Sequence, residues 1–318
     1  MNYIAYKLEF PCGVHFGKNS LTDSLFRVCA DTIFSALCQE AVKIGQDKLE
    51  ELVSRCKAGG ILISDGLPYI YDADSKQDTL YVPKPIVGKQ SREDGQVIDS
   101  VKRKAFNKLT YVPIDKLTEY LNGEIDEYIV DEQEKLSSLG KEDMRVLVNL
   151  KDGKMPYHLG TFSFNDGNGL YIVLGYETEA DKSLFCELIK NLSYSGIGGK
   201  RSAGLGGFVV TEFELDNQYI ERLNQTEGAT FMTLSVSLPV GDENELSPIL
   251  EEATYEVMKR SGFIDFEGQD KYIRKEDLYV FAAGSCFAQR YEGDIYNVGY
   301  DDTKVYRYAN QCFCSYRR

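Results

Sequence analysis

The sequence lacks long hydrophobic runs, and no window of about 18 residues is apolar enough to cross a membrane. Its first residues, MNYIAYKLEF, alternate like a strand and contain neither the basic segment nor the apolar stretch of a signal peptide. We therefore expect a soluble, cytoplasmic protein.

Metal-binding cysteine patterns are also missing. The eight cysteines include no CxxC pair and form no regular framework, which predicts reduced thiols. Cys312 and Cys314 lie two residues apart, but a zinc site needs two further ligands near them. Acidic residues at 124–134 have no fixed ligand spacing, which favours a solvated surface over a metal site. We expect no metal and no cofactor.

Basic charge is scarce overall. The chain has 36 Lys and Arg against 50 Asp and Glu, a net charge of −14, which argues against a generic nucleic-acid binder. One segment, residues 84–108, has an excess of positive charge, with seven Lys or Arg residues and three Asp or Glu residues. These cations, which are candidate phosphate contacts, are Lys84, Lys89, Arg92, Lys102, Arg103, Lys104 and Lys108. A solvated basic loop is the alternative explanation for this segment.

The order of apolar and polar residues predicts an α+β protein. The expected elements of the first half are a strand at 3–10, helices over 31–41 and 49–56, and a strand at 61–64. Asp31 is the expected N-cap of the first helix. Regular pattern is then scarce from 66 to 108, which indicates an irregular insertion of functional or mobile character.

Farther along, the expected elements are a hairpin across 161–176 with its turn at 165–169, a helix with an apolar stripe over 184–192, and a strand at 208–215. The second half opens with a strand at 230–238 and a helix capped by Ser247 with Pro248 at its first position. Strands follow at 278–283, 295–300 and 305–316.

This order predicts two tandem ferredoxin-like units of the β-α-β-β-α-β type. The first domain spans 1–226, with an insertion at about 66–145 and a glycine-rich loop at 195–207. The second spans 227–318, where only one helix is evident. The polar stretch 216–228 is the expected boundary.

The loop at 195–207 reads SGIGGKRSAGLGG, with six glycines in thirteen positions and Lys200-Arg201 at its centre. Such a backbone can approach a phosphate closely. The loop sequence matches neither the Walker A pattern nor the dinucleotide-binding fingerprint. Those motifs also run from strand to helix, whereas this loop runs from helix to strand. A flexible surface connector is the alternative explanation.

A glycine-rich loop in this place resembles the signature loop of the RAMP proteins of CRISPR systems, which bind CRISPR RNA. More narrowly, the chain resembles the family of the fourth subunit of the type III-A Csm effector complex. The stretches that carry the resemblance are residues 13–17 (GVHFG), 30–38 (ADTIFSALC), 83–85 (PKP), 195–208, and 283–287 (AGSCF) with Gly293.

The resemblance implies a non-catalytic subunit in antiviral defence that caps the 5′ handle of the guide RNA and meets target RNA only indirectly. It also implies docking beside the large polymerase-like signalling subunit and the adjoining RAMP backbone subunit. The RNA contacts that it implies are Gly196, Gly198, Gly199, Lys200, Arg201, Ser202, Gly204 and Gly206, with the basic insertion as a second contact. Gly284 and Ser285 are weaker candidates.

Histidine is rare too, with only His15 and His158 present. His15 lies between two glycines near the place expected for the glycine loop. It shapes its loop or contacts RNA without chemistry. As the alternative function, it acts as general base of a metal-independent endoribonuclease that processes precursor guide RNA. A protein scaffold that uses its acidic faces is a third hypothesis.

Overall fold

The computed structural model describes residues 1–17, 20–87, 104–105, 108–122, 129–148, 155–264, 273–300 and 304–317. Four of the predicted RNA contacts lie outside the described residues, namely Lys89, Arg92, Lys102 and Arg103. Among the described helices, none is long and apolar enough to span a bilayer.

The first part of the chain, up to β8, contains β1 (Asn2–Glu9), α1 (Ala30–Ile44), α2 (Gln46–Lys57), β2 (Ile61–Ile63), β3 (Leu67–Asp72), β4 (Gln77–Pro83), β5 (Tyr111–Pro113), α4 (Leu117–Asn122), α5 (Ile129–Ser137), β6 (Gly140–Val148), β7 (Pro156–Phe164) and β8 (Gly169–Tyr176). These are followed by α6 (Glu179–Ser195), β9 (Val209–Phe213) and α7 (Asn217–Asn224). The later part contains β10 (Thr230–Thr233), α8 (Glu243–Leu250), β11 (Val257–Arg260), β12 (Phe263–Ile264), β13 (Ile273–Arg274), β14 (Leu278–Phe281), β15 (Cys286–Phe287), β16 (Ile295–Asn297), β17 (Tyr306–Tyr308) and β18 (Phe313–Tyr316).

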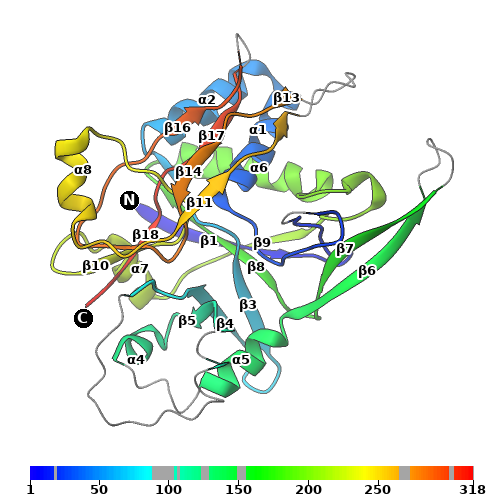
Figure 1. Ribbon diagram of the computed structural model, residues 1–318, viewed down its shortest axis with the longest axis horizontal. Helices are drawn as coiled ribbons and strands as arrows, with labels where there is room; N and C mark the ends of the chain where they lie inside the picture. The colour runs from blue at the N-terminus through cyan, green and yellow to red at the C-terminus, as the bar shows by residue number, and fades with distance from the viewer. Residues whose placement is uncertain are drawn as a thin grey trace.

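The largest sheet has the order β5-β4-β3-β8-β1-β9, with β2 also pairing with β8, and its pairings are antiparallel. Helix α1 connects β1 to β2, and α6 connects β8 to β9, so the inner order β3-β8-β1-β9 follows the β-α-β-β-α-β scheme expected for the first unit. The helices α1, α2 and α6 lie together beside this sheet (Figure 1).

Strand β8 is buried along almost its whole length because it has a hydrophobic cluster on each face. Leu170, Ile172 and Leu174 face the cluster that includes α1 and α6. Tyr171 and Val173 alternate with them and face a second cluster that includes residues of β10 and β18. A strand covered on both faces has a continuous apolar sequence, here GLYIVLGY, instead of a polar alternation.

The second half packs against the first through both clusters. In its described part the strands form a three-stranded sheet, β15-β10-β18, and three separate pairs, β11-β14, β12-β13 and β16-β17. A second β-α-β-β-α-β unit therefore stays a prediction. The expected boundary at 216–228 contains helix α7, whose Tyr219 and Leu223 are buried in the second cluster.

Several local expectations are wrong. The stretch 66–108 contains the regular strands β3 and β4. The strands on either side of 165–169 do not form a hairpin, because β7 pairs with β6 and β8 pairs with β1. Together β6 and β7 make a long two-stranded ribbon that projects from the body (Figure 1).

Both predicted helix caps are also wrong. Asp31 lies inside the first turn of α1, and the amide of Ala30 instead donates to the carboxylate of Asp65 at 2.8 Å. Asp65 thus supplies the cap from a distant part of the chain. Helix α8 begins after Asp242, whose side chain forms a capping box with Glu245, so Pro248 lies inside the helix.

Candidate nucleic-acid interface

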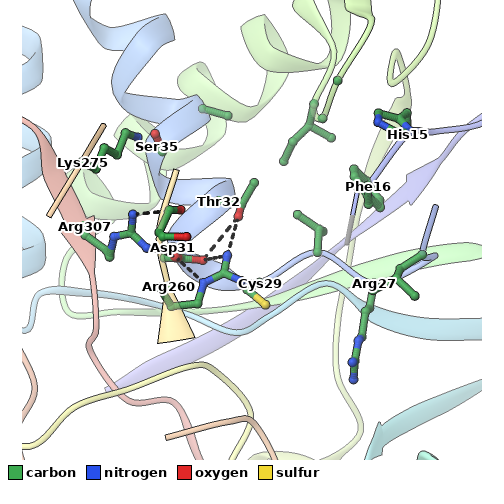
Figure 2. A pocket seen from close by; sticks show the side chains of 18 of the residues that line it. His15, Phe16, Arg27, Cys29, Asp31, Thr32, Ser35, Arg260, Lys275 and Arg307 are labelled. Carbon is green, nitrogen blue, oxygen red and sulfur yellow. Dashed lines mark hydrogen bonds and ion pairs between the residues drawn. The ribbon is translucent and has the colours of Figure 1, made fainter. Parts of the chain in front are cut away.

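A cavity of about 690 Å³ lies where the glycine loop, the start of α1 and the second half meet. One side is lined by His15, Phe16 and loop residues of 196–201, and the other by residues of β11 and β17 together with Lys275. Figure 2 shows His15 and Phe16 on one side of this cavity and Arg307 and Lys275 on the other, with Asp31 between them. The cavity therefore joins segments from both halves of the sequence.

Positive charge dominates the lining of this cavity. Of the described residues that line it, six are Lys or Arg and one is an acid, Asp31. The cations are Arg27, Arg201, Lys259, Arg260, Lys275 and Arg307. In a chain with a net charge of −14, this concentration makes the cavity an attractive place for an anion. Among these six, the sequence patterns pointed only to Arg201.

Asp31 is the centre of an ion-pair cluster that joins the two halves. Its carboxylate accepts hydrogen bonds from Nε of Arg260 at 2.8 Å and from Nη2 at 2.7 Å. Nη1 of Arg307 lies farther away, at 3.4 Å. Burial opposes the charge of Arg260, but the adjacent Asp31 raises its pKa above the usual value. This geometry explains why Asp31 is buried within the helix instead of capping it.

The glycine loop is held against the segment around His15 by backbone hydrogen bonds. The amide of Gly199 donates to the carbonyl of His15 at 2.9 Å, and the amide of Gly206 donates to the carbonyl of Gly13 at 3.0 Å. A Cβ on Gly198 would lie 2.8 Å from the His15 carbonyl oxygen, so the chains approach too closely for a larger residue. The predicted proximity of His15 and the loop is confirmed.

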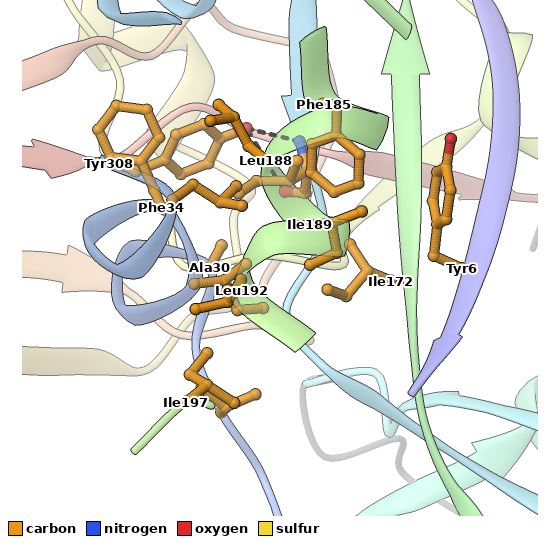
Figure 3. Packing of buried hydrophobic residues seen from close by; sticks show 14 of the residues in the cluster. Tyr6, Ala30, Phe34, Ile172, Phe185, Leu188, Ile189, Leu192, Ile197 and Tyr308 are labelled. Atoms are coloured by element: carbon orange, nitrogen blue, oxygen red, sulfur yellow. Dashed lines mark hydrogen bonds between the residues drawn. The ribbon is translucent and has the colours of Figure 1, made fainter. Parts of the chain in front are cut away.

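Ile197 anchors the loop in the main hydrophobic cluster, where it lies beyond the end of α6 near Leu192 (Figure 3). The loop then turns through Lys200, which has a left-handed φ of 59°, into a 3-10 turn over Arg201–Ala203. The helix-to-strand placement expected for the loop is confirmed by α6 before it and β9 after it. The loop therefore lies beside the cavity and is attached to the body by the packing of Ile197.

Fewer loop amides are available to a ligand than the glycine count suggests. The amides of Gly196, Gly199, Gly204 and Gly206 all donate to carbonyls within the protein. Within the described residues, six loop amides have no such acceptor, namely those of Gly198, Lys200, Arg201, Ser202, Leu205 and Gly207. Of these six, only Gly198 and Arg201 belong to residues that line the cavity.

The adjacent cations Lys200 and Arg201 have different surroundings. Arg201 lines the cavity, whereas Nζ of Lys200 lies 4.9 Å from the centre of the Tyr157 ring on β7. Ser202 and Gly204 are exposed on the outer side of the loop and do not line the cavity. Gly206 is packed against Ile197, where a Cβ would lie 2.1 Å from the carbonyl oxygen.

His15 is buried and lines the cavity. Its Nδ1 lies 2.7 Å from the carbonyl oxygen of Gly160, which can only accept, so Nδ1 carries a hydrogen and donates it. In the neutral ring, Nε2 is then the acceptor. His158 is exposed on β7 and is not part of the lining.

The described part of the basic insertion does not reach the cavity. Lys84 is half-buried, and its backbone packs closely against Gly284 of the second half. A Cβ added to Gly284 would lie 2.7 Å from the carbonyl oxygen of Lys84. Burial lowers the pKa of Lys84 from its usual value. Lys104 and Lys108 are exposed, and neither lines the cavity. Gly284 and the neighbouring Ser285 therefore have roles in packing, and Ser285 donates to the Ala282 carbonyl at 2.7 Å.

Comparison with known proteins gives the family. Residues 226–315 match the family described as CRISPR Csm4 C-terminal domain. A Mycobacterium tuberculosis protein described as CRISPR system Cms protein Csm4 is 34% identical over 317 residues, which cover 98% of this chain and 97% of that protein. The chain belongs to the Csm4 family. A Streptococcus thermophilus protein of the same description is 32% identical over 302 residues, covering 94% of this chain and 93% of its own length.

Solved Csm4 structures have the same fold. A chain in the crystal structure of a Csm3-Csm4 subcomplex from a type III-A CRISPR-Cas interference complex matches with a TM-score of 0.65 at 17% identity, covering 99% of this chain and all of that one. A chain in a Csm1-Csm4 cassette with pppApA matches with a TM-score of 0.59 at 18% identity, covering 98% and 96%. The resemblance predicted from the sequence is confirmed at the level of family and fold.

Proposed function

We propose that this Csm4-family chain is a non-catalytic subunit of a type III-A effector ribonucleoprotein and holds the 5′ handle of the guide RNA in the cavity beside the glycine loop. The observation that carries the proposal is the described lining of this cavity, which has six Lys and Arg side chains and one acid in a protein of net negative charge. An RNA backbone carries one negative charge at each phosphate, and release of its counterions favours binding to such a surface.

The contacts proposed for the loop follow from its geometry. Among the loop residues that line the cavity, the amides of Gly198 and Arg201 and the guanidinium of Arg201 are the donors without an acceptor in the described part of the protein. Arginine suits this role because its planar guanidinium can donate two parallel hydrogen bonds to one phosphate. Backbone and guanidinium contacts of this kind hold a strand without reading its bases.

The proposed partners come from the solved relatives. One Csm4 is described in a subcomplex with Csm3, and another in a cassette with Csm1. We infer that this chain docks on the corresponding backbone and large subunits, and that target RNA meets it only through the guide. We also infer a cytoplasmic location, where the complex can assemble around newly made guide RNA.

The direct test is guide RNA retention by the assembled complex containing Arg201→Gln. We expect weaker retention and a shallower dependence of affinity on salt, because one phosphate contact is lost. Lys182→Gln is the matched control, because Lys182 pairs with Glu212 at 2.8 Å outside the cavity. Wild-type retention by Arg201→Gln across the salt series would reject the proposed site.

Endonuclease chemistry through His15 is the rival function, and the placement of its ring at the cavity is the observation that favours it. Purified protein is incubated with repeat RNA in the presence of a chelator. The binding function predicts intact RNA with both wild type and His15→Ala. Specific cleavage that His15→Ala abolishes would establish the enzyme instead.

A further inference from the structure

The cavity wall contributed by the second half contains more positive charge than its acid can balance. Arg260, Arg307 and Lys275 line this wall around the single carboxylate of Asp31 among the described lining residues. In Figure 2, Lys275 and Arg307 lie on the opposite side of Asp31 from His15 and Phe16. The wall is therefore separate from the glycine loop, although both border the same cavity.

The two arginines on this wall differ in how many of their donors are used. Arg260 gives two short hydrogen bonds to Asp31, and its Nη2 also donates to Thr32 at 3.0 Å. Arg307 makes only long contacts within the described residues, at 3.4 Å to Asp31 and 3.4 Å to the Ser261 carbonyl. Arg260 is thus committed to the protein, whereas the guanidinium of Arg307 retains donors for another acceptor.

Lys275 adds a second cation with no matched acid. It is half-buried, and in the part of the chain that the structure describes it forms no ion pair. Burial lowers the pKa of Lys275, and the neighbouring Arg307 lowers it further, while burial also lowers the pKa of Arg307. A charge such as that of Lys275, which is partly removed from water and has no ion pair within the described residues, reduces stability and so indicates a ligand of opposite sign.

We propose that Arg307 and Lys275 form a second phosphate subsite, which binds one phosphate group of the guide RNA on the wall opposite the glycine loop. Asp31 is a positioning residue that holds Arg260 and orients Arg307 without contacting RNA. This assignment rests on the proposed function and adds a contact from the second half of the chain. The two walls then bind the same strand from opposite sides.

Removal of a charge from such a site should stabilise the free protein and weaken its binding to RNA, and the test measures both effects. Lys275→Met removes a poorly solvated charge, so the Tm of the full chain should rise. The same change should weaken guide RNA retention by the assembled complex about tenfold, the loss expected for one charged hydrogen bond. It should also reduce the salt slope by about 0.7, the value for one phosphate contact on a single strand.

Two further variants make the assignment specific. Arg307→Gln should lose RNA affinity in the same way, and Lys182→Met should change neither readout. Asp31→Asn should lower the Tm of the free chain. Adding RNA should raise the Tm of this variant more than it raises the Tm of wild type, because a phosphate replaces the missing negative charge. A purely structural Asp31 would lower the Tm of the free and bound forms equally, which would overturn the positioning role.

The outcome separates this subsite from the proposed function. If Arg201→Gln releases the guide while Lys275→Met and Arg307→Gln retain it with the wild-type salt slope, the second subsite is wrong and the proposed function stands. If the wild-type complex does not hold guide RNA, the proposed function itself fails. A Tm increase with inorganic phosphate that Lys275→Met abolishes, at unchanged RNA affinity, would assign the site to free phosphate and overturn the RNA assignment.

Discussion

The amide of Gly199 donates a hydrogen bond of 2.9 Å to the carbonyl oxygen of His15. This bond joins the glycine loop to the segment that follows β1, two parts of the chain that are distant in sequence. The same carbonyl oxygen would lie 2.8 Å from a Cβ on Gly198. Several loop glycines are therefore required by close packing within the protein, before any ligand is considered.

The loop should be sensitive to a methyl group at one glycine and tolerant of it at the next. Gly206 has a φ of +79°, and its Cβ would meet the Ile197 carbonyl oxygen, so Gly206→Ala combines backbone strain with overpacking. We expect the free energy of unfolding to fall by about 2–4 kcal/mol. At Gly207 the nearest atom lies 3.8 Å from where a Cβ would stand, and Gly207→Ala should be tolerated. Chemical denaturation measures both, and equal losses would contradict this packing.

The adjacent cations of the loop should contribute unequally to RNA binding. Arg201 lines the cavity, whereas the ammonium of Lys200 lies over the ring of Tyr157. Arg201→Gln should therefore weaken guide RNA binding and reduce its salt slope by about 0.7, and Lys200→Gln should change the slope less. Binding measured over a range of salt concentrations tests this order. A larger effect of Lys200→Gln would show that the loop reorients when it binds RNA.

The Asp31 cluster should contribute strongly to the stability of the whole chain. Arg260→Met leaves Asp31 buried with only the distant Arg307, and we expect the free energy of unfolding to fall by about 3 kcal/mol. Lys259→Met is the control on the same strand, because the pair of Lys259 with Asp277 is exposed and should change stability by less than about 1 kcal/mol. Similar losses for the two variants would contradict a special role for the buried cluster.

Asp65 should make stability depend on pH. Burial, opposed in part by the amides of Ala30 and Val236, raises the pKa of Asp65 to about 7, with Asp31 raising it slightly and Arg260 lowering it. The folded state then binds the proton more tightly than the unfolded state, so this group's contribution to stability is present below about pH 4 and is lost as pH rises to about 7.

Asp65→Asn removes this dependence and can keep both amide hydrogen bonds, because one oxygen, Oδ1, accepts them both. We expect the variant to be more stable than wild type at pH 8, by about 2 kcal/mol, and to differ little at pH 4. Urea unfolding at the two pH values is the measurement. A variant that is less stable than wild type at pH 8 would show that the fold favours the charged carboxylate, which contradicts a raised pKa for Asp65.

The sequence predicted those elements whose pattern of apolar and polar residues is local. The apolar stripes of α1 and α6, the first strand, and the helix-to-strand place of the glycine loop all follow from residues close together in the chain. The proposed fold also placed His15 near the glycine loop, and the structure shows that both line one side of the cavity. Asp31 was misassigned as a cap because its true partners, Arg260 and Arg307, come from the other half of the chain.

The second wall of the cavity could not be predicted for the same reason. Arg260, Lys275 and Arg307 are isolated cations on different segments, and no local pattern connects them. The strands β3 and β4 were missed because Gly66 and Pro68 at one end and Pro83 at the other suggested irregular structure. Their pairing within the large sheet outweighs these local signals, since a sheet is stabilised by contacts between distant residues.

The most direct test of the central claim is a crosslinking map of guide RNA on this subunit within its assembled complex. The proposed function predicts crosslinks in the loop around Arg201, and the second subsite adds crosslinks around Lys275 and Arg307. Crosslinks confined to residues outside the cavity, with the loop unlabelled, would contradict the account.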